Sequence, residues 1–323
     1  MEKSPLIKVK GFFFSIFAGL DRQLGLILLG LAAVGFFTFL SASQNTPVQI
    51  ADELRNLALS FVVMWLVSRI PPKWLEMGAV WIYGIGVALL IAVAAFGLIK
   101  KGARRWLNIG VVIQPSEIMK IAMPLMLAWY FQKREGIQKS WDYGVAAIIL
   151  AIPVFLIARQ PDLGTALLVF AAGLYVIILA GLPWKWILPF VGLGVVGILL
   201  IIIFGSTICA HDVVWPFVHN YQKHRVCTLL DPTSDPLGKG FHTIQSMIAI
   251  GSGGFFGKGW FQGTQAHLEF IPEKHTDFVF AVFSEEFGLL GNLVLLALFF
   301  ALIKRGLAIS ASAPNLFTRL LGA

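Results

Sequence analysis

The feature that most constrains this chain is a series of apolar runs, each close to the length that crosses a lipid bilayer. A span needs about 20 mostly apolar residues, and a helix satisfies its own backbone groups in hydrocarbon. Hydrophobic residues make up 58% of the 323 positions and charged residues only 13%. The pattern predicts an all-α integral membrane protein, a polytopic helical bundle with about eight spans. The runs are residues 24–43, 77–98, 113–131, 164–180, 186–204 and 278–303, with shorter ones at 54–70 and 143–157.

The first residues carry no pattern of a cleavable signal peptide, because no small-residue cleavage site follows the first apolar run. Residues 12–20 are apolar but too short to span, and Lys3, Lys8 and Lys10 precede them. We expect this segment to lie along the inner membrane face, with its lysines at the anionic headgroups.

The formal net charge of +8 indicates membrane topology rather than nucleic-acid binding, because cytoplasmic loops accumulate Lys and Arg. With the N-terminus inside, most basic clusters fall on the cytoplasmic side. The loop with Lys100, Lys101, Arg104 and Arg105 falls outside and breaks this rule. Binding of an anionic ligand would explain a basic cluster there. The clusters that follow the rule are Arg69 with Lys73, Lys133 with Arg134 and Lys139, Lys185, and Lys304 with Arg305.

One loop is long, about residues 205–277, and loops of that length are usually functional. It is expected to face an oxidising compartment, and it contains Cys209 and Cys227. The sequence leaves a disulfide and two free thiols equally open; a bridge would contribute about 3 kcal/mol. Within the loop, residues 241–250 are semi-apolar but too short to span, which predicts a re-entrant or interfacial helix.

A glycine-rich run covers residues 251–259. It fails the P-loop pattern, because Ser252 stands where the first glycine is required and Gly259 where Ser or Thr is required. The residues favour a flexible or tightly packed loop. The alternative is a set of exposed amides beside Lys258 that approach an anionic headgroup.

Asp277 stands directly before the apolar run 278–303. One interpretation is a helix N-cap. The other is a general base that accepts a proton from an attacking hydroxyl, provided that the carboxylate is buried enough for the task. The two are compatible, since a cap also fixes the carboxylate in place.

Other polar residues lie within or at the ends of the predicted spans. Glu285 and Glu286 fall inside the predicted span 278–303. Carboxylates within a membrane span usually face a cavity or a charged partner, so a structural pair and a functional role both remain open. Glu117 precedes Lys120 by three residues, which predicts a structural pair on one helix face, neutralised inside the bundle. Taken by itself, Asp162 is explained as a helix cap. Taken together with the other polar clusters that are expected on the outer side of the membrane, Asp162 implies a polar cavity open to the outside.

Several motifs, in order along the whole chain, resemble signatures of the SEDS family (shape, elongation, division and sporulation proteins). The stretch at 257–265 is similar to the elongation branch rather than the division branch. Members have about ten spans, so the resemblance implies a single transmembrane domain over 1–323 whose last spans are missing. The motifs are residues 102–107 with 114–117, residues 160–165, residues 236–246 with the glycine run, and residues 268–278 followed by Glu285 and Glu286.

The resemblance implies a peptidoglycan glycosyltransferase that polymerises lipid II during cell elongation, on the periplasmic side of the bacterial inner membrane. Asp277 would be the base and undecaprenyl pyrophosphate the leaving group, with inversion. A divalent cation, Mg²⁺ or Mn²⁺, would suit the pyrophosphate, and no organic cofactor is expected. The partners implied are a class B penicillin-binding protein (a transpeptidase), other elongation-complex proteins and membrane lipids. The expected substrate-binding residues are Arg104, Arg105 and Lys258 for the anion, and Asp162, Lys239 and His242 along the cavity.

Two other functions remain open. A lipid II transporter would use the intramembrane Glu285, Glu286, Glu117 and Lys120 as a pathway. Against it, the polar clusters gather on the outer side and no inverted repeat is visible. A scaffold for a cell-wall transpeptidase is the second, and it is compatible with catalysis.

Overall fold

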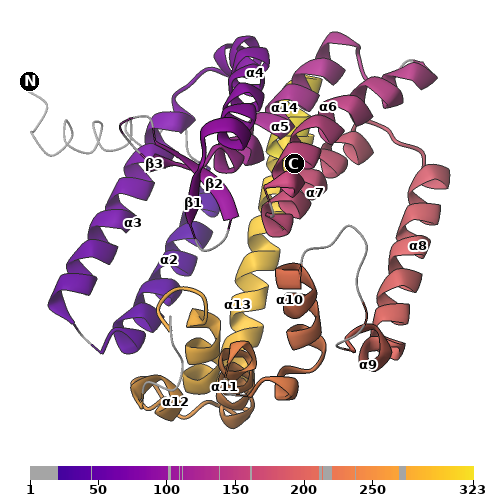
Figure 1. Ribbon diagram of the computed structural model, residues 1–323. Coiled ribbons are helices and arrows are strands. Elements are labelled where there is room, and N and C mark those ends of the chain that lie inside the picture. Colours follow the sequence, from indigo (N-terminus) through magenta and orange to yellow (C-terminus); the bar gives the residue numbers. More distant parts are fainter. Residues whose placement is uncertain are drawn as a thin grey trace, which may run out of the picture. The chain divides into compact units, whose positions relative to one another are not determined.

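The computed structural model describes residues 21–44, 46–100, 103–108, 110, 112–137, 139–160, 162–210, 213, 220–236, 238–268 and 274–323. Helices dominate this part of the chain, which confirms the all-α membrane class (Figure 1). The expected surface segment at residues 12–20, with Lys3, Lys8 and Lys10, lies outside the described residues.

Each predicted apolar run is a helix. Five helices among the described residues are long and apolar enough to cross a membrane: α2, α4, α6, α8 and α13. Prolines stand in the first turn of α3, α4 and α5, where a missing amide costs nothing. The count of about eight spans stays a prediction. The bounds are α2 Arg22–Ala42, α3 Pro47–Ser68, α4 Pro72–Phe96, α5 Pro115–Lys133, α6 Ser140–Arg159, α7 Leu163–Leu179, α8 Trp184–Ile203 and α13 Val279–Ala311.

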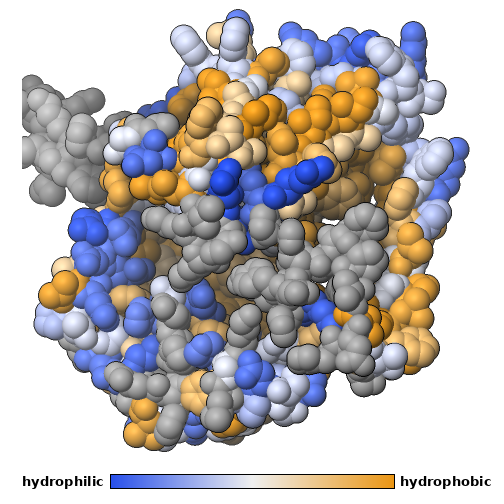
Figure 2. Space-filling view, in the orientation of Figure 1, coloured by the Kyte–Doolittle hydropathy of each residue, from blue (hydrophilic) through white to orange (hydrophobic). Residues whose placement is uncertain are grey.

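The chain divides into two compact units, which are described separately. The first unit comprises Met1–Arg69 and Leu199–Arg305, and the second comprises Ile70–Ile198 and Gly306–Ala323. α8 passes from one to the other and buries none of its residues against the described rest of the chain. Figure 2 shows hydrophobic side chains along it, as expected for a helix that meets lipid.

The second unit is built around α5, which packs against α4, α6, α7 and the short helix α14 (Leu316–Gly322). Met119, Met123 and Leu127 of α5 are fully buried. A Cβ added at Gly86 of α4 would collide with Met119, and one added at Gly173 of α7 would collide with Leu150 of α6. Small residues at such contacts let membrane helices approach closely.

A small antiparallel sheet in the second unit was not predicted. Its strands are β1 Leu98–Lys100, β2 Ala103–Asn108 and β3 Val112–Ile113, in the order β1-β2-β3. Ile99 pairs with Arg104, so Arg104 and Arg105 of the expected basic loop lie in a strand that pairs with β1. Ile99 of β1 and Trp106 of β2 are residue types that favour strands.

In the first unit, α2 and α13 pack side by side in opposite directions. Asp21 caps the start of α2 and accepts a hydrogen bond from Arg305 Nε at 2.9 Å. Ser41, at the other end of α2, donates to Glu286. The two helices are therefore tied by polar contacts at both ends of their shared length.

The Asp21–Arg305 contact predicts a specific acid sensitivity. A side-chain hydrogen bond from Arg305 is the main cause that lowers the pKa of Asp21 from 3.8 to about 2. Stability from a lowered carboxyl pKa is fully present above the unfolded value and is lost as the pH falls through the folded one. We expect wild type to lose more thermal stability between about pH 4 and pH 2 than Asp21→Asn. Melting temperatures that fall in parallel in both proteins would refute this.

The described part of the long loop is mostly helical, and the loop belongs to the first unit. The expected interfacial helix is α11, which confirms a helix at residues 241–250. Gly240 of α11 lies against the backbone of Pro232 and Asp235, where no side chain fits. The elements are α9 Gly205–Ile208, α10 Asn220–Leu230, the 3₁₀ turn η1 Pro232–Ser234, α11 Lys239–Ser252 and α12 Thr264–His267.

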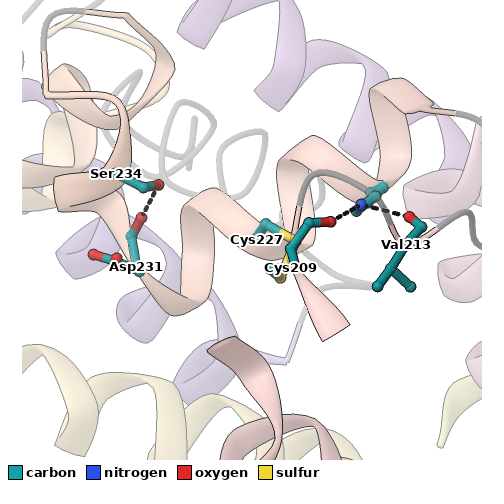
Figure 3. The surroundings of a disulfide bond; sticks show 7 residues. Cys209, Val213, Cys227, Asp231 and Ser234 are labelled. Carbon is teal, nitrogen blue, oxygen red and sulfur yellow. Dashed lines mark hydrogen bonds between the residues drawn. A yellow bond between two sulfur atoms is a disulfide. The ribbon is translucent and has the colours of Figure 1, made fainter. Parts of the chain in front are cut away.

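A disulfide between Cys209 and Cys227 ties α10 to the end of α9 (Figure 3). Beside it, Lys223 donates to the carbonyl oxygens of Ala210 and Val213, both at 2.7 Å. Of the two alternatives that the sequence left open, the structure therefore has the bridge.

Removing this bridge should loosen the loop. We expect Cys209→Ser/Cys227→Ser to lower the free energy of unfolding of the loop by about 3 kcal/mol, because the bridge restricts the unfolded chain. Limited proteolysis of wild type and variant, with and without reductant, measures this. Cleavage rates that do not respond to reductant in wild type would contradict the expectation.

Candidate active site

Asp277 lies in a turn of residues 274–278, two residues before α13 begins at Val279. Its side chain is exposed and has no hydrogen-bond partner among the described residues. The carbonyl oxygen of Phe278 accepts from the amides of Ala281 and Val282 at 3.0 and 3.4 Å. Asp277 therefore caps none of these amides, and the cap interpretation is wrong. The described residues do not bury it.

The neighbours of Asp277 connect α11 with α13. Phe278 packs against Ala249 and Ala281, and its ring lies 6.1 Å from that of His242. The α11 residue His242, expected to line the site, is thus placed next to the residue that follows Asp277.

Two histidines near this turn each have a buried ring nitrogen without a hydrogen-bond partner among the described residues. The Nδ1 atoms of His242 and His275 are buried and have no hydrogen-bond partner within the described residues. The ring of His275 also stacks edge-on against Phe39, with centroids 6.4 Å apart. Buried polar atoms are normally satisfied, so both nitrogens are candidates for contact with a bound ligand. His275 was missed from the sequence, although it stands two residues before Asp277.

Lys258 is engaged in a buried ion pair. Its Nζ lies 2.6 Å from Glu285 Oε1 and donates to Thr264 Oγ1 at 2.9 Å. The side chain of Glu285 has no exposed surface. The charge of Lys258, expected to bind pyrophosphate, is therefore largely compensated within the protein.

The glycine-rich run is a tightly packed loop, as favoured from the sequence. The amides of Lys258 and Gly259 donate to the carbonyl oxygens of Glu285 and Glu286, both at 3.0 Å. The amide of Gly257 donates to Gly253 O at 2.8 Å. These amides are used, so the alternative of an anion cradle at Lys258 is wrong.

The run fits into a break in α13. Gly288 has φ 62° and ψ −161°, which interrupts the helix. The amides of Leu289 and Leu290 donate instead to the carbonyl oxygens of Gly254 and Phe255, at 2.9 and 3.0 Å. The loop thus replaces the helical partners that the break removes, as interrupted membrane helices require.

Glu285 and Glu286 have structural partners, and these come from different segments. Glu285 pairs with the glycine-rich run through Lys258, and buried Glu286 accepts from Ser41 of α2. The interpretation as structural pairs is supported, although only Glu286 meets a neighbouring helix.

The second unit gathers a separate polar cluster. Asp162 caps α7 through the amide of Thr165 at 3.4 Å and accepts from Gln114 Nε2 at 3.2 Å. Arg105 Nη1 lies 3.8 Å from Asp162, and Arg104 donates to Ala94 O at 3.0 Å. The cap expected for Asp162 is confirmed, and Arg105 is brought to it.

Glu117 and Lys120 pair at 2.7 Å, as predicted from their spacing. Their side chains are 54% and 35% exposed in the second unit. The expectation that the pair is enclosed inside the helix bundle is therefore wrong for this unit.

The expected site residues fall in two groups. Asp277, His242 and Lys258 belong to the first unit, as does Lys239, the first residue of α11. Arg104, Arg105 and Asp162 belong to the second. The described residues contain no cluster of three or more His, Cys, Asp or Glu that could hold a metal ion. The described side chains therefore offer no set of ligands that fits a resident metal.

Known proteins resemble this chain over most of its length. The family FTSW_RODA_SPOVE, described as "Cell cycle protein", matches residues 14–323. Peptidoglycan glycosyltransferase MrdB of Escherichia coli K12 is 46% identical over 304 residues, covering 94% of this chain and 79% of the relative. Probable peptidoglycan glycosyltransferase FtsW of Aliivibrio salmonicida is 34% identical over 302 residues, covering 90% and 71%.

Solved structures agree. A chain from work on structural coordination of polymerization and crosslinking by a peptidoglycan synthase complex matches with TM-score 0.71 and 34% identity, over 94% of this chain and 81% of that one. Rod shape determining protein RodA of Thermus thermophilus matches with TM-score 0.61 and 27% identity, over 94% and 79%. The chain belongs to the FtsW, RodA and SpoVE family.

Proposed function

We propose that this chain polymerises lipid II into the glycan strands of peptidoglycan, with Asp277 as the general base. The class of enzyme, a peptidoglycan glycosyltransferase, is confirmed by the names of the relatives. The single observation that carries the residue assignment is the position of Asp277. It is an exposed carboxylate with no hydrogen-bond partner among the described residues, beside two buried histidine nitrogens without partners.

The reaction follows from what such a carboxylate can do. Asp277 accepts the proton of the acceptor sugar's 4-hydroxyl as that oxygen bonds to the anomeric carbon of the donor. The bond from the anomeric carbon to the pyrophosphate oxygen breaks, the configuration inverts, and undecaprenyl pyrophosphate leaves with the electron pair. Bound lipid and sugar exclude water from the exposed carboxylate, which strengthens its interactions.

The developing negative charge on the leaving group needs cations. Arg104 and Arg105 are the proposed anion-binding residues, since Lys258 is already neutralised by Glu285. Asp162 holds Arg105, which makes it a supporting residue. A divalent cation, Mg²⁺ or Mn²⁺, would be held chiefly by the pyrophosphate oxygens and water. No step of the mechanism depends on it.

An apolar groove in the first unit is the proposed seat of the prenyl chain. Its volume is about 450 Å³, and it lies between α2, α13 and the end of the glycine-rich run. Trp260 closes one side and donates through Nε1 to Phe37 O at 3.0 Å. Its lining residues are Val34, Phe37, Phe256, Trp260, Phe283, Phe287, Leu290, Gly291 and Val294.

The apolar helices and the family relationship make the chain a multi-pass membrane protein. We place it as one transmembrane domain in the bacterial inner membrane, with Asp277 on the periplasmic side. We also propose a class B penicillin-binding protein as its partner, on the precedent of the peptidoglycan synthase complex that contains a related chain.

Purified chain in vesicles with lipid II and the partner transpeptidase tests the function. Glycan strands that appear with time are the expected product. Movement of lipid II between leaflets without polymer would favour the transporter, and partner binding without polymer would favour the scaffold. The structure weighs against the transporter, because Glu285 and Glu286 are both engaged in buried contacts.

A further inference from the structure

We propose that Gln114 is a positioning residue for Arg105, acting through the carboxylate of Asp162. The inference rests on the proposed function, in which Arg105 stabilises the charge of the leaving pyrophosphate. All three residues belong to the second unit. A hydrogen bond joins Gln114 to Asp162, and an ion pair joins Asp162 to Arg105.

Three neighbouring elements bring these side chains together. Arg105 lies in β2, Gln114 is the N-cap residue of α5, and Asp162 is the N-cap residue of α7. Leu107 of β2 pairs with Ile113 of β3, which directly precedes Gln114. α5 also packs against α7, so the core of the unit fixes the two helix starts relative to each other.

The side-chain amide of Gln114 is directed at Asp162 by a second contact. Its Nε2 donates to Asp162 Oδ2 at 3.2 Å and to Ser116 Oγ at 3.1 Å, which uses both protons of the nitrogen. An ionised carboxylate can only accept, so the nitrogen of the amide, and not its oxygen, has to face Asp162. The Gln114 side chain makes no cap bond to the backbone of α5. Its described contacts therefore serve Asp162 and Ser116 rather than the helix end.

The two oxygens of the Asp162 carboxylate have different partners. The residue is only 7% exposed. Oδ1 accepts from the amide of Thr165 at 3.4 Å and lies 3.8 Å from Arg105 Nη1. Oδ2 accepts from Gln114. Because a partner holds each oxygen, the carboxylate cannot turn freely about its Cβ–Cγ bond.

This arrangement sets the distance between Asp162 and Arg105. Charge-assisted hydrogen bonds between nitrogen and oxygen are about 2.7–2.9 Å long. At 3.8 Å the carboxylate orients the guanidinium without closing onto it. Lys258 of the first unit shows the closed alternative, with Nζ 2.6 Å from Glu285. Without Gln114, Asp162 loses the donor to Oδ2 and turns toward the charged donor beside it, so Arg105 becomes neutralised as Lys258 is.

The test compares Gln114→Met with Gln132→Met, in the full chain with its partner, on lipid II. Methionine has nearly the length of glutamine but no donor. Gln114→Met should lower kcat about tenfold, the order expected for a hydrogen bond to a charged group. KM should stay within about twofold, because the charge that Arg105 stabilises develops in the transition state.

Gln132→Met is the matched control from the same helix. Gln132 Oε1 accepts from the amide of Phe317 at 2.8 Å, so its replacement also removes a tertiary hydrogen bond from the second unit. It should retain wild-type kcat. Melting temperatures of both variants are recorded in parallel, and a loss of kcat that only follows the melting temperature would overturn the inference.

A double-mutant cycle shows whether Gln114 acts through Arg105. Arg105→Gln removes the charge and should lower kcat by itself, and adding Gln114→Met should then cost less than about twofold more. Wild-type kcat in Gln114→Met, or full additivity of the two changes, would overturn the inference. If Arg105→Gln polymerises as fast as wild type, the proposed anion-binding role fails. If Arg105→Gln is impaired while Gln114→Met is normal, only the inference fails.

Discussion

Replacing Asp277 with Asn is expected to lower the rate of glycan polymerisation by about 10²- to 10⁴-fold, the usual contribution of a general base. Asn has nearly the same shape but cannot take up the proton of the attacking hydroxyl. Asp277 makes no hydrogen bond within the described residues, so its replacement removes no contact that stabilises the fold. The measurement is the initial rate of polymer formation by the purified complex, with the melting temperature recorded in parallel.

Two variants make this result specific. Asp277→Glu retains a carboxylate at a shifted position and should recover part of the rate. Asp52→Asn loses an exposed carboxylate on α3 and should retain all of it. An Asp277→Asn protein that polymerises as fast as wild type would remove the base assignment while leaving the enzyme class untouched.

A methyl group at Gly288 should destabilise the first unit strongly. The residue has φ 62° and ψ −161°, a conformation that is essentially restricted to glycine. An added Cβ would also collide with Gly257 N and lie 2.8 Å from Phe255 O. We expect Gly288→Ala to cost about 3 kcal/mol or more, from backbone strain and overpacking together. Thermal unfolding in detergent should show a large fall in melting temperature.

Gly35 provides the matched control, because it lies in α2 of the same unit and no atom stands within 4 Å of an added Cβ. Gly35→Ala should be neutral or slightly stabilising, since alanine is the better helix former. Equal melting temperatures for Gly35→Ala and Gly288→Ala would mean that the break in α13 tolerates a side chain, contrary to this account.

The helices could be predicted because the bilayer imposes a length and an apolar composition on each one separately. The Glu117–Lys120 pair and the Asp162 cap were predictable for a similar reason, because their partners lie within four residues. The break at Gly288 was not, since the backbone groups that satisfy it come from the glycine-rich run more than thirty residues earlier. Local sequence gives no sign of such a partner.

The sequence predicted which residues belong to the site, but not which side chains contact one another there. The resemblance pointed to Asp277 and Lys258 alike, yet only the contact with Glu285 shows that Lys258 is already neutralised. The strands around Arg104 were missed because β1 and β3 are only three and two residues long, too short to show an alternating pattern. His275 was overlooked beside a stronger candidate in the same motif.

The interrupted helix also has a consequence for how the chain is made. The ribosome completes residues 254–259 before it begins α13. When α13 leaves the translocation channel, acceptors for the amides of Leu289 and Leu290 therefore already exist. Without them, each of these amides would enter hydrocarbon at a cost of several kcal/mol. The glycine-rich run precedes α13 in the sequence. The interrupted helix can therefore enter the membrane with acceptors already present for the backbone amides of Leu289 and Leu290.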